Sequence, residues 1–159
     1  MVGDRVMAGY RDVYEKAQAD VAAFWMQAAE AIDWHKAPTR ALDSSEPPFH
    51  RWFPDGEMNT CHNAVDRHVA AGRGEQKAII YDSPITGNAG SLTYAELQTA
   101  TARFAGMLRR LGVGAGDRVI IYMPMITEAV VAMLGCARLG AVHSVVFGGF
   151  AAAELAKRI

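Results

Sequence analysis

The sequence predicts an α/β fold in which an N-terminal helix and an extended segment precede the first strands and helices of a parallel sheet. Residues 10–32 carry apolar side chains at helical spacing, and residues 33–61 lose that periodicity and are rich in proline and aromatic residues. Residues 119–159 alternate short apolar runs with helical patterns. Alternation of this kind with short joints is typical of a βαβ crossover, which pairs its strands in parallel.

Length and composition agree with a folded domain. The chain has 159 residues, of which 51% are hydrophobic, 21% charged and 9% aromatic, so disorder, collagen and a disulfide scaffold are excluded. Sixteen basic residues against seventeen acidic ones give a net charge of −1. A near-neutral chain has no overall field that favours nucleic acid or an anionic membrane, so we expect neither as a partner.

The N-terminus and the cysteines favour a soluble, cytoplasmic protein. Residues 1–16 lack the apolar core of a signal peptide. The longest apolar run, Ala129–Ala137, is far shorter than the ~20 residues that cross a bilayer. Cys61 and Cys136 are too few for a secreted disulfide framework, so both thiols are expected to be reduced.

The first part of the chain, residues 1–62, predicts one amphipathic helix followed by a strap. The helix covers residues 10–32, because its apolar positions repeat every three to four residues and leave a polar side. Prolines interrupt the strap, which is expected to have no regular structure. Its aromatic residues are expected to anchor it to the surface: Trp34, Phe49, Trp52 and Phe53.

Residues 63–112 predict a short helix, a hairpin and a longer helix. The short helix covers Asn63–Ala71, with Asn63 as its cap and its end near Gly72. A strand at Ala78–Tyr81 and the turn residues after it indicate the hairpin. Thr93 to Glu96 form a capping box that opens the longer helix, which Gly112 ends. The apolar face of this helix comprises Leu97, Thr101, Phe104, Leu108 and Leu111.

The last third predicts the βαβ unit. Val119–Met123 is a continuous apolar strand, and a helix over Ile126–Leu139 follows it. A second strand covers Val142–Phe147 and leads into another helix over Ala151–Ile159. We therefore expect two parallel strands in one sheet, within a domain that occupies residues 63–159.

Motifs for nucleotide, metal and nucleophile chemistry are weak or missing. The glycine run Gly112–Asp117 has neither the dinucleotide spacing nor the strand-before-helix context. Cys61, His62 and His68 lack the second pair of ligands that structural zinc requires. His143 lies inside the second predicted strand and is expected to be partly buried with its hydrogen bonds satisfied. The sequence therefore predicts no catalytic residue and no metal site.

The loop Phe147–Phe150 is the one segment whose position favours binding. It follows a parallel strand at its carboxyl end, where open α/β sheets bind ligands. Gly148 and Gly149 would let the backbone approach a ligand, and the next helix would present its first amides. The alternative is a tight strand-to-helix turn that binds nothing.

Three stretches resemble the N-terminal part of AMP-forming short-chain acyl-CoA synthetases. They are FWMQAAEAIDW, FHRWFPDGEMNTCHNAVDRHV and GDRVIIYMPMITEAVVAMLGCARLGAVHSVVFGGFAAAELAKRI. The resemblance covers nearly the whole chain from about Tyr10. It is closest to the propionyl-CoA synthetases, with the acetyl-CoA synthetases next.

The resemblance implies the opening elements of the large N-terminal domain of an acyl-adenylate-forming enzyme, as an incomplete fold. It also implies a propionate– or acetate–CoA ligase reaction in two steps. A short carboxylate attacks the α-phosphate of Mg-ATP to give an acyl-adenylate and pyrophosphate, and the coenzyme A thiol then gives the thioester and AMP. By the same resemblance, Phe147, Gly148 and Gly149 lie beside the adenine end of coenzyme A.

The resemblance also implies what these residues do not supply. The family's phosphate loop, its nucleotide- and metal-binding acidic residues, its carboxylate pocket and its mobile C-terminal domain are not among them. We therefore expect an N-terminal fragment that is inactive alone and binds ATP, magnesium and coenzyme A weakly or not at all. The alternative is a non-catalytic folding or interaction module, which associates with itself or complements the other half of a split synthetase.

Overall fold

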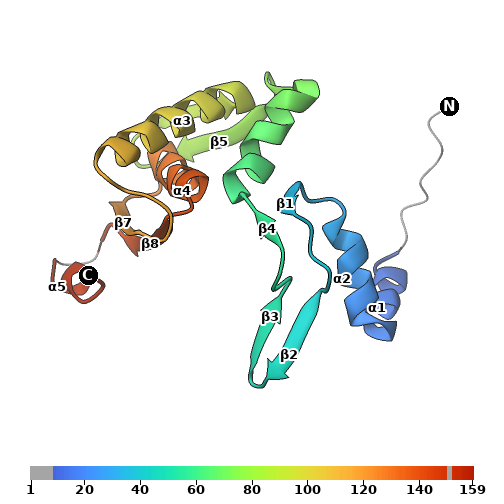
Figure 1. Ribbon diagram of the computed structural model, residues 1–159. Helices are drawn as coiled ribbons and strands as arrows, with labels where there is room; N and C mark the ends of the chain where they lie inside the picture. Colours follow the sequence, from blue (N-terminus) through green and yellow to red (C-terminus); the bar gives the residue numbers. More distant parts are fainter. Residues whose placement is uncertain (1–8, 150–151) are drawn as a thin grey trace. The chain divides into compact units, whose positions relative to one another are not determined.

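The computed structural model describes residues 9–149 and 152–159, and the chain divides into two compact units. The first unit ends at Met58 and the second begins at Asn59, whereas the sequence pattern placed the boundary after residue 62. Figure 1 shows the elements in chain order, from the blue helices of the first unit to the red strands and helix of the second.

Two helices, α1 (Tyr10–Ala19) and α2 (Val21–Ala29), replace the single helix predicted over residues 10–32. The break falls at Asp20, whose backbone is extended, with φ −150° and ψ 94°. Its carboxylate accepts a hydrogen bond from the Ala23 amide at 2.9 Å. Aspartate is one of the best N-cap residues, so it starts a second helix instead of continuing the first.

The strap contains short strands, and the prediction that it lacks regular structure is wrong. β1 (Trp34–Lys36) pairs with β4 (Glu57–Met58), and β2 (Leu42–Glu46) pairs with β3 (Phe49–Trp52). Both pairs are antiparallel, and the Pro47–Pro48 bond between β2 and β3 is cis. The prolines therefore lie in the connections between strands, and the residues between them are free to form the hydrogen bonds of antiparallel pairs.

Three of the four predicted aromatic anchors pack inside the first unit. The ring of Trp34 lies 5.6 Å from that of Phe53, and the ring of Trp52 lies 5.6 Å from that of Trp25, measured between centroids. Phe49 is 76% exposed, so it anchors nothing in this unit. It begins β3, a strand whose residues are all exposed.

The second unit opens with wide helical turns over residues 60–73, including the π-type segments η1 (His62–Asp66) and η2 (Val69–Arg73). Asn59 caps these turns, not the predicted Asn63, because the Asn59 side-chain oxygen accepts a hydrogen bond from the His62 amide at 3.0 Å. The segment ends where predicted, since Gly72 takes the left-handed φ of +78°.

A hairpin and a capped helix follow as predicted. β5 (Lys77–Ser83) and β6 (Asn88–Thr93) pair antiparallel, and α3 (Tyr94–Arg110) starts directly after them. The Glu96 amide donates to Thr93 Oγ1 at 3.2 Å, and the Thr93 amide donates to the Glu96 carboxylate at 2.8 Å. These bonds from Thr93 hold the pKa of Glu96 below its usual value, and they confirm the capping box.

The buried face of α3 matches the prediction except at its last position. Leu111 is 73% exposed because it is the C-cap residue, just before Gly112 takes φ +89° and ends the helix. A residue beyond the last helical turn no longer follows the helical face. The buried residues of α3 are Leu97, Thr101, Ala105 and Leu108.

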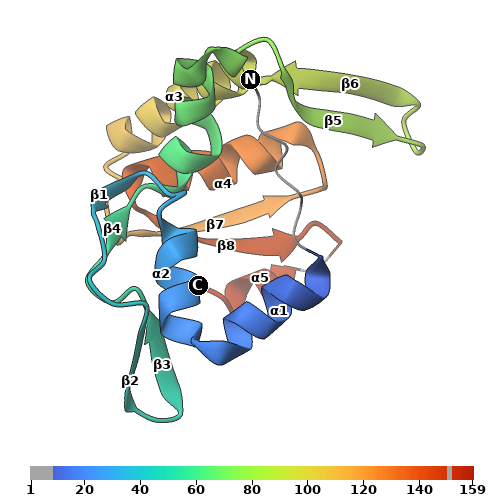
Figure 2. The same cartoon turned by 90° about the vertical axis from the view of Figure 1, so that its right-hand side faces the viewer.

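The predicted βαβ unit is confirmed. β7 (Arg118–Met123), α4 (Thr127–Leu139) and β8 (Val142–Phe147) follow one another, and the two strands pair in parallel. Figure 2 shows α4 over these strands and α3 beyond it. α4 ends at Gly140, which has φ +73°. The core between the strands and helices contains Leu108, Ile121, Ala132, Cys136 and Ala141.

Candidate functional site

The loop predicted as a binding site lies at the carboxyl ends of the two parallel strands. β7 ends at Met123, and β8 ends opposite it at Phe147. Gly148 and Gly149 follow directly and are exposed. Phe150, the last residue of the predicted loop, lies outside the described residues. The two strand ends therefore stand side by side at the edge of the sheet where α/β folds bind ligands.

Gly148 lies against the backbone of the neighbouring strand end. A Cβ atom at this position would be 3.2 Å from the nitrogen of Pro124 and 3.3 Å from the carbonyl carbon and oxygen of Met123. All three atoms belong to the main chain, which cannot turn aside as the tip of a long side chain can. Glycine at this position therefore has a packing reason that is independent of any ligand.

The helix after the loop is shorter than predicted. α5 covers Ala152–Ala156, whereas the sequence predicts a helix over Ala151–Ile159. Ala151 lies outside the described residues, and residues 157–159 form a turn and the chain end. A helix of five residues aligns few peptide dipoles, so the attraction for an anion that we expected at its start is small.

His143 is exposed, so the prediction of a partly buried histidine is wrong. Among the described residues, β8 pairs only with β7, and side chains of this two-stranded sheet stay open to solvent. Tyr122 is 44% exposed, Val142 56% and Val145 44%. Continuous apolar strands of this type normally have both faces covered.

A polar cluster in the second unit was not predicted from the sequence. Arg138, in the last turn of α4, donates a hydrogen bond to the Asp66 carboxylate at 2.7 Å. Gln98 of α3 donates to the same carboxylate oxygen at 2.8 Å. The Arg138 and Asp66 side chains are only 26% and 20% exposed. A single carboxylate thus links η1, α3 and α4, and no local pattern predicts a pair that lies 72 residues apart.

Asn59 links the same elements through its side-chain amide. Its Nδ2 donates to the carbonyl oxygens of Ala137 at 3.3 Å and Arg138 at 3.1 Å. Because its Oδ1 also caps the turns that begin at residue 60, one side chain satisfies polar groups at the ends of two helical segments. The first residue of the second unit is therefore fixed to the end of α4.

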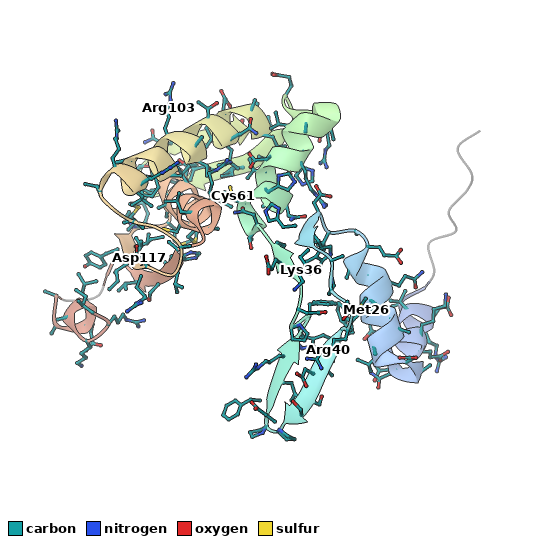
Figure 3. The ribbon with its side chains drawn as sticks, viewed as in Figure 1. Met26, Lys36, Arg40, Cys61, Arg103 and Asp117 are labelled. Atoms are coloured by element: carbon teal, nitrogen blue, oxygen red, sulfur yellow. The ribbon has the colours of Figure 1, made fainter. Side chains whose placement is uncertain are left out.

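Neither cysteine has the setting of a nucleophile. Cys61, labelled in Figure 3 where the segment after β4 meets α4, is fully buried, and so is Cys136. Burial raises the pKa of the Cys61 thiol, and Asp66 adds to this effect while Arg138 opposes it. Burial also raises the pKa of Cys136. A buried thiol with a raised pKa supplies little thiolate at neutral pH.

The first unit has an apolar pocket of about 290 Å³, whose walls include Trp25, Trp34 and Phe53. Across residues 9–149 and 152–159, no three side chains of the His, Cys, Asp and Glu types come together to hold a metal ion. Over the same ranges, no helix combines the length and apolarity needed to cross a membrane.

Comparisons with known proteins cover both units. A family model described as "AMP-binding enzyme" matches residues 66–159, and one described as "Acetyl-coenzyme A synthetase N-terminus" matches residues 10–64. The chain belongs to the AMP-binding enzymes. Within this family, residues 59–64 match the N-terminal model although they lie structurally in the second unit.

Curated members of this family match almost the whole length of the chain. An uncharacterised protein of Pseudomonas aeruginosa is 55% identical over 150 residues, which are 94% of this chain and 24% of that protein. The acetyl-coenzyme A synthetase of Burkholderia thailandensis is 49% identical over 154 residues, 96% of this chain and 23% of that enzyme. The chain thus spans about a quarter of the length of these curated relatives.

A solved structure confirms the fold class. The acetoacetyl-CoA synthetase from Streptomyces lividans matches with a TM-score of 0.83 and 31% identity, over 95% of this chain and 23% of that one. The chain is therefore an α/β region equivalent to the N-terminal part of an acyl-CoA synthetase, and it forms only a portion of that larger fold. The predicted resemblance to the N-terminal part of the acyl-CoA synthetases is therefore confirmed.

Proposed function

We propose that this chain is the N-terminal part of an ATP-dependent, AMP-forming propionyl-CoA synthetase, with acetate as the alternative substrate. The observation that carries the proposal is the pair of family matches, which together span residues 10–64 and 66–159. The resemblance described above is closest to the propionyl-CoA synthetases, while the relatives named above include an acetyl-coenzyme A synthetase. In the whole protein, the carboxylate would attack the α-phosphate of ATP, and coenzyme A would then take the acyl group.

In this proposal the described residues position the loop that contacts coenzyme A, and none of them takes part in the chemical steps. ATP and magnesium would bind to groups that the family carries outside these elements, and magnesium would offset phosphate charge during adenylate formation. β7 and β8 would carry the strand-end loop, Phe147 to Gly149, to the adenine end of coenzyme A. The exposed glycines leave the main chain open to a flat ring, which supports this assignment.

Coenzyme A binding by the loop gives a test on the chain alone. We expect coenzyme A to shift the amide NMR signals of Phe147 to Gly149 with a Kd of about 1 mM or weaker, because one loop supplies few of the contacts that offset association costs. Pantetheine, which lacks the adenine nucleotide, is the control and should leave these signals unchanged. Unchanged loop signals at several millimolar coenzyme A, or equal shifts with pantetheine, would remove the assignment.

A second candidate is a non-catalytic interaction module. The partly exposed Tyr122, Val142 and Val145 of the two-stranded sheet favour it, because open apolar strands promote association. Under this alternative the chain pairs with itself or with a separate remainder of a synthetase. Light scattering on the purified chain tests the first form of this alternative, because a stable monomer would count against self-association.

A further inference from the structure

We propose that α2 is a docking surface for the part of the synthetase that the relatives carry beyond the matched region, and that an apolar side chain of that part fills the pocket beside α2. The inference rests on the proposed function, since it takes the chain as part of a longer synthetase. It assigns no ligand and no chemical step. It gives the first unit a role of its own, which is to hold the N-terminal region onto the rest of the enzyme.

The composition of α2 does not match its exposure. Gln27 is the only polar residue in this helix, whose sequence is VAAFWMQAA. Ala29 is nevertheless its only buried residue, and Val21 and Trp25 are 40% and 42% exposed. A helix that is apolar on nearly all sides is normally buried in a core. The described part of the chain therefore leaves α2 without the cover that its sequence predicts.

One side of α2 borders the apolar pocket of the first unit. Trp25, Ala28 and Ala29 line the pocket from one face of the helix, and Trp34 and Phe53 line it from the strap. None of the described lining residues is charged, and the Trp34 indole N–H already donates to the Ala29 carbonyl at 2.8 Å. A phosphate or carboxylate would lose its hydration there without gaining a charged partner, so the pocket favours an apolar occupant.

The surroundings of α2 favour a segment of the same enzyme over a membrane or a second copy. The helix lies between two acidic residues, its N-cap Asp20 and its C-cap Glu30, whereas helices that lie on membranes are rich in lysine and arginine. A symmetric pair of chains would place the same surface face to face, so each hollow would meet a hollow. Only 23% of the Burkholderia thailandensis enzyme is matched, so most of that enzyme is available to supply the cover. We therefore assign the pocket to an apolar side chain of that further part.

The test measures how fast a thiol at position 28 reacts with a maleimide, in the chain alone and in a chimera. The chimera carries this chain in place of the matching region of the Burkholderia thailandensis enzyme. Ala28→Cys places the thiol in the wall of the pocket. Gln27→Cys is the matched control, because Gln27 is exposed on the same helix and is not among the residues that line the pocket. Peptide mass spectrometry separates this labelling from that of the buried Cys61 and Cys136.

We expect position 28 to react about a hundredfold more slowly in the chimera than in the chain alone, because a covered thiol reacts only when its site opens. Position 27 should react at similar rates in both proteins. A charge at position 28 gives a second readout. Ala28→Asp should leave the melting temperature of the chain alone unchanged, because Ala28 is exposed. In the chimera it should lower the soluble yield by about tenfold, because it buries an unpaired carboxylate, while Gln27→Asp should not.

The opposite results would overturn the proposal. Equal rates at position 28 in the chain and the chimera would do so, as would an unchanged yield of the Ala28→Asp chimera. Slow labelling of position 28 in the chain alone would also do so, because this chain or a second copy of it would then already cover the pocket. Failure of the proposed function gives a different result, in which position 28 is protected in a chimera that makes no acetyl-CoA.

Discussion

Asp66→Ala is expected to lower the free energy of unfolding of the second unit by about 3 kcal/mol, because it leaves a largely buried charge without its partner. Arg138 donates to Asp66 at 2.7 Å, and Gln98 donates to the same oxygen at 2.8 Å. Burial works against the charge of Arg138, but Asp66 and the neighbouring Cys61 together raise the pKa of the guanidinium. Removing the carboxylate leaves two donors without their acceptor, and the guanidinium stays charged because arginine does not lose its proton in proteins.

The measurement must follow the second unit alone. All three tryptophans, Trp25, Trp34 and Trp52, lie in the first unit, so tryptophan fluorescence would report on the wrong part. Hydrogen exchange of the α4 amides in increasing urea reports on the second unit. Asp82→Ala removes an exposed carboxylate from β5 and is the control, with an expected change within about 0.5 kcal/mol.

A double variant distinguishes a stranded charge from a simple loss of contacts. Asp66→Ala with Arg138→Met should be less destabilised than Asp66→Ala alone, because the uncompensated cation is gone. A single Asp66→Ala variant within about 0.5 kcal/mol of the wild type would contradict the role of the cluster. So would a double variant that is less stable than the single one.

Gly135→Ala is expected to destabilise the second unit by about 2 kcal/mol, although alanine is the better helix former. Gly135 is buried where α4 packs on α3, and its Cβ would lie 2.6 Å from Cδ1 of Phe104 and 3.5 Å from the nitrogen of Ala105. The Phe104 ring must move, and it packs against the core formed by Leu108 and Ile121. The cost of this displacement exceeds the gain in helix propensity.

Gly106→Ala makes the same substitution on the facing helix in open space. It should stabilise the unit by about 0.5–1 kcal/mol, because only the propensity gain remains. Urea titrations of both variants, monitored by hydrogen exchange of the α4 amides, measure whether the free energy of unfolding falls in one variant and rises in the other. Equal effects at both positions would contradict the close α3–α4 packing.

The sequence predicted the elements whose signals are local. The capping box at Thr93 and Glu96 was predicted from residues three apart, and the parallel strands from apolar runs joined by a short helix. The left-handed glycines Gly72, Gly112 and Gly140 marked helix ends for the same reason. The capping box and the glycines each lie within one turn of chain, and the strand–helix–strand pattern is continuous in sequence, so none of these signals depends on residues from distant segments.

The features that the sequence did not predict have two origins. Either two local signals compete at one residue, or the contact joins residues that lie far apart in the chain. The apolar periodicity continues across Asp20 and predicts one helix. Asp20 nevertheless breaks it, because its side chain caps the start of a second helix. Asn59 is preferred to Asn63 because its amide also reaches the carbonyl groups at the end of α4. The Asp66–Arg138 pair joins segments 72 residues apart, and no window along the sequence reveals it.

The position of the candidate loop in the fold was predicted from the sequence, and its binding role stays a prediction. The strand-end position of Phe147 to Gly149 follows from the βαβ pattern, and the structure has the strand ends side by side. The contact between Gly148 and the Met123–Pro124 peptide depends on the register of two strands, which sequence periodicity does not fix to within an ångström. Coenzyme A as the ligand of this loop therefore stays a prediction from the resemblance, whereas the structure gives the packing reason for Gly148.

The most direct measurement is acyl-CoA synthesis by a chimera in which this chain replaces the matching 23% of the Burkholderia thailandensis acetyl-coenzyme A synthetase. We expect the chimera to form acetyl-CoA, AMP and pyrophosphate from acetate, ATP and coenzyme A, while the chain alone releases no pyrophosphate with acetate or propionate. A folded chimera that makes no acetyl-CoA, or carboxylate-dependent pyrophosphate release by the chain alone, would contradict the account.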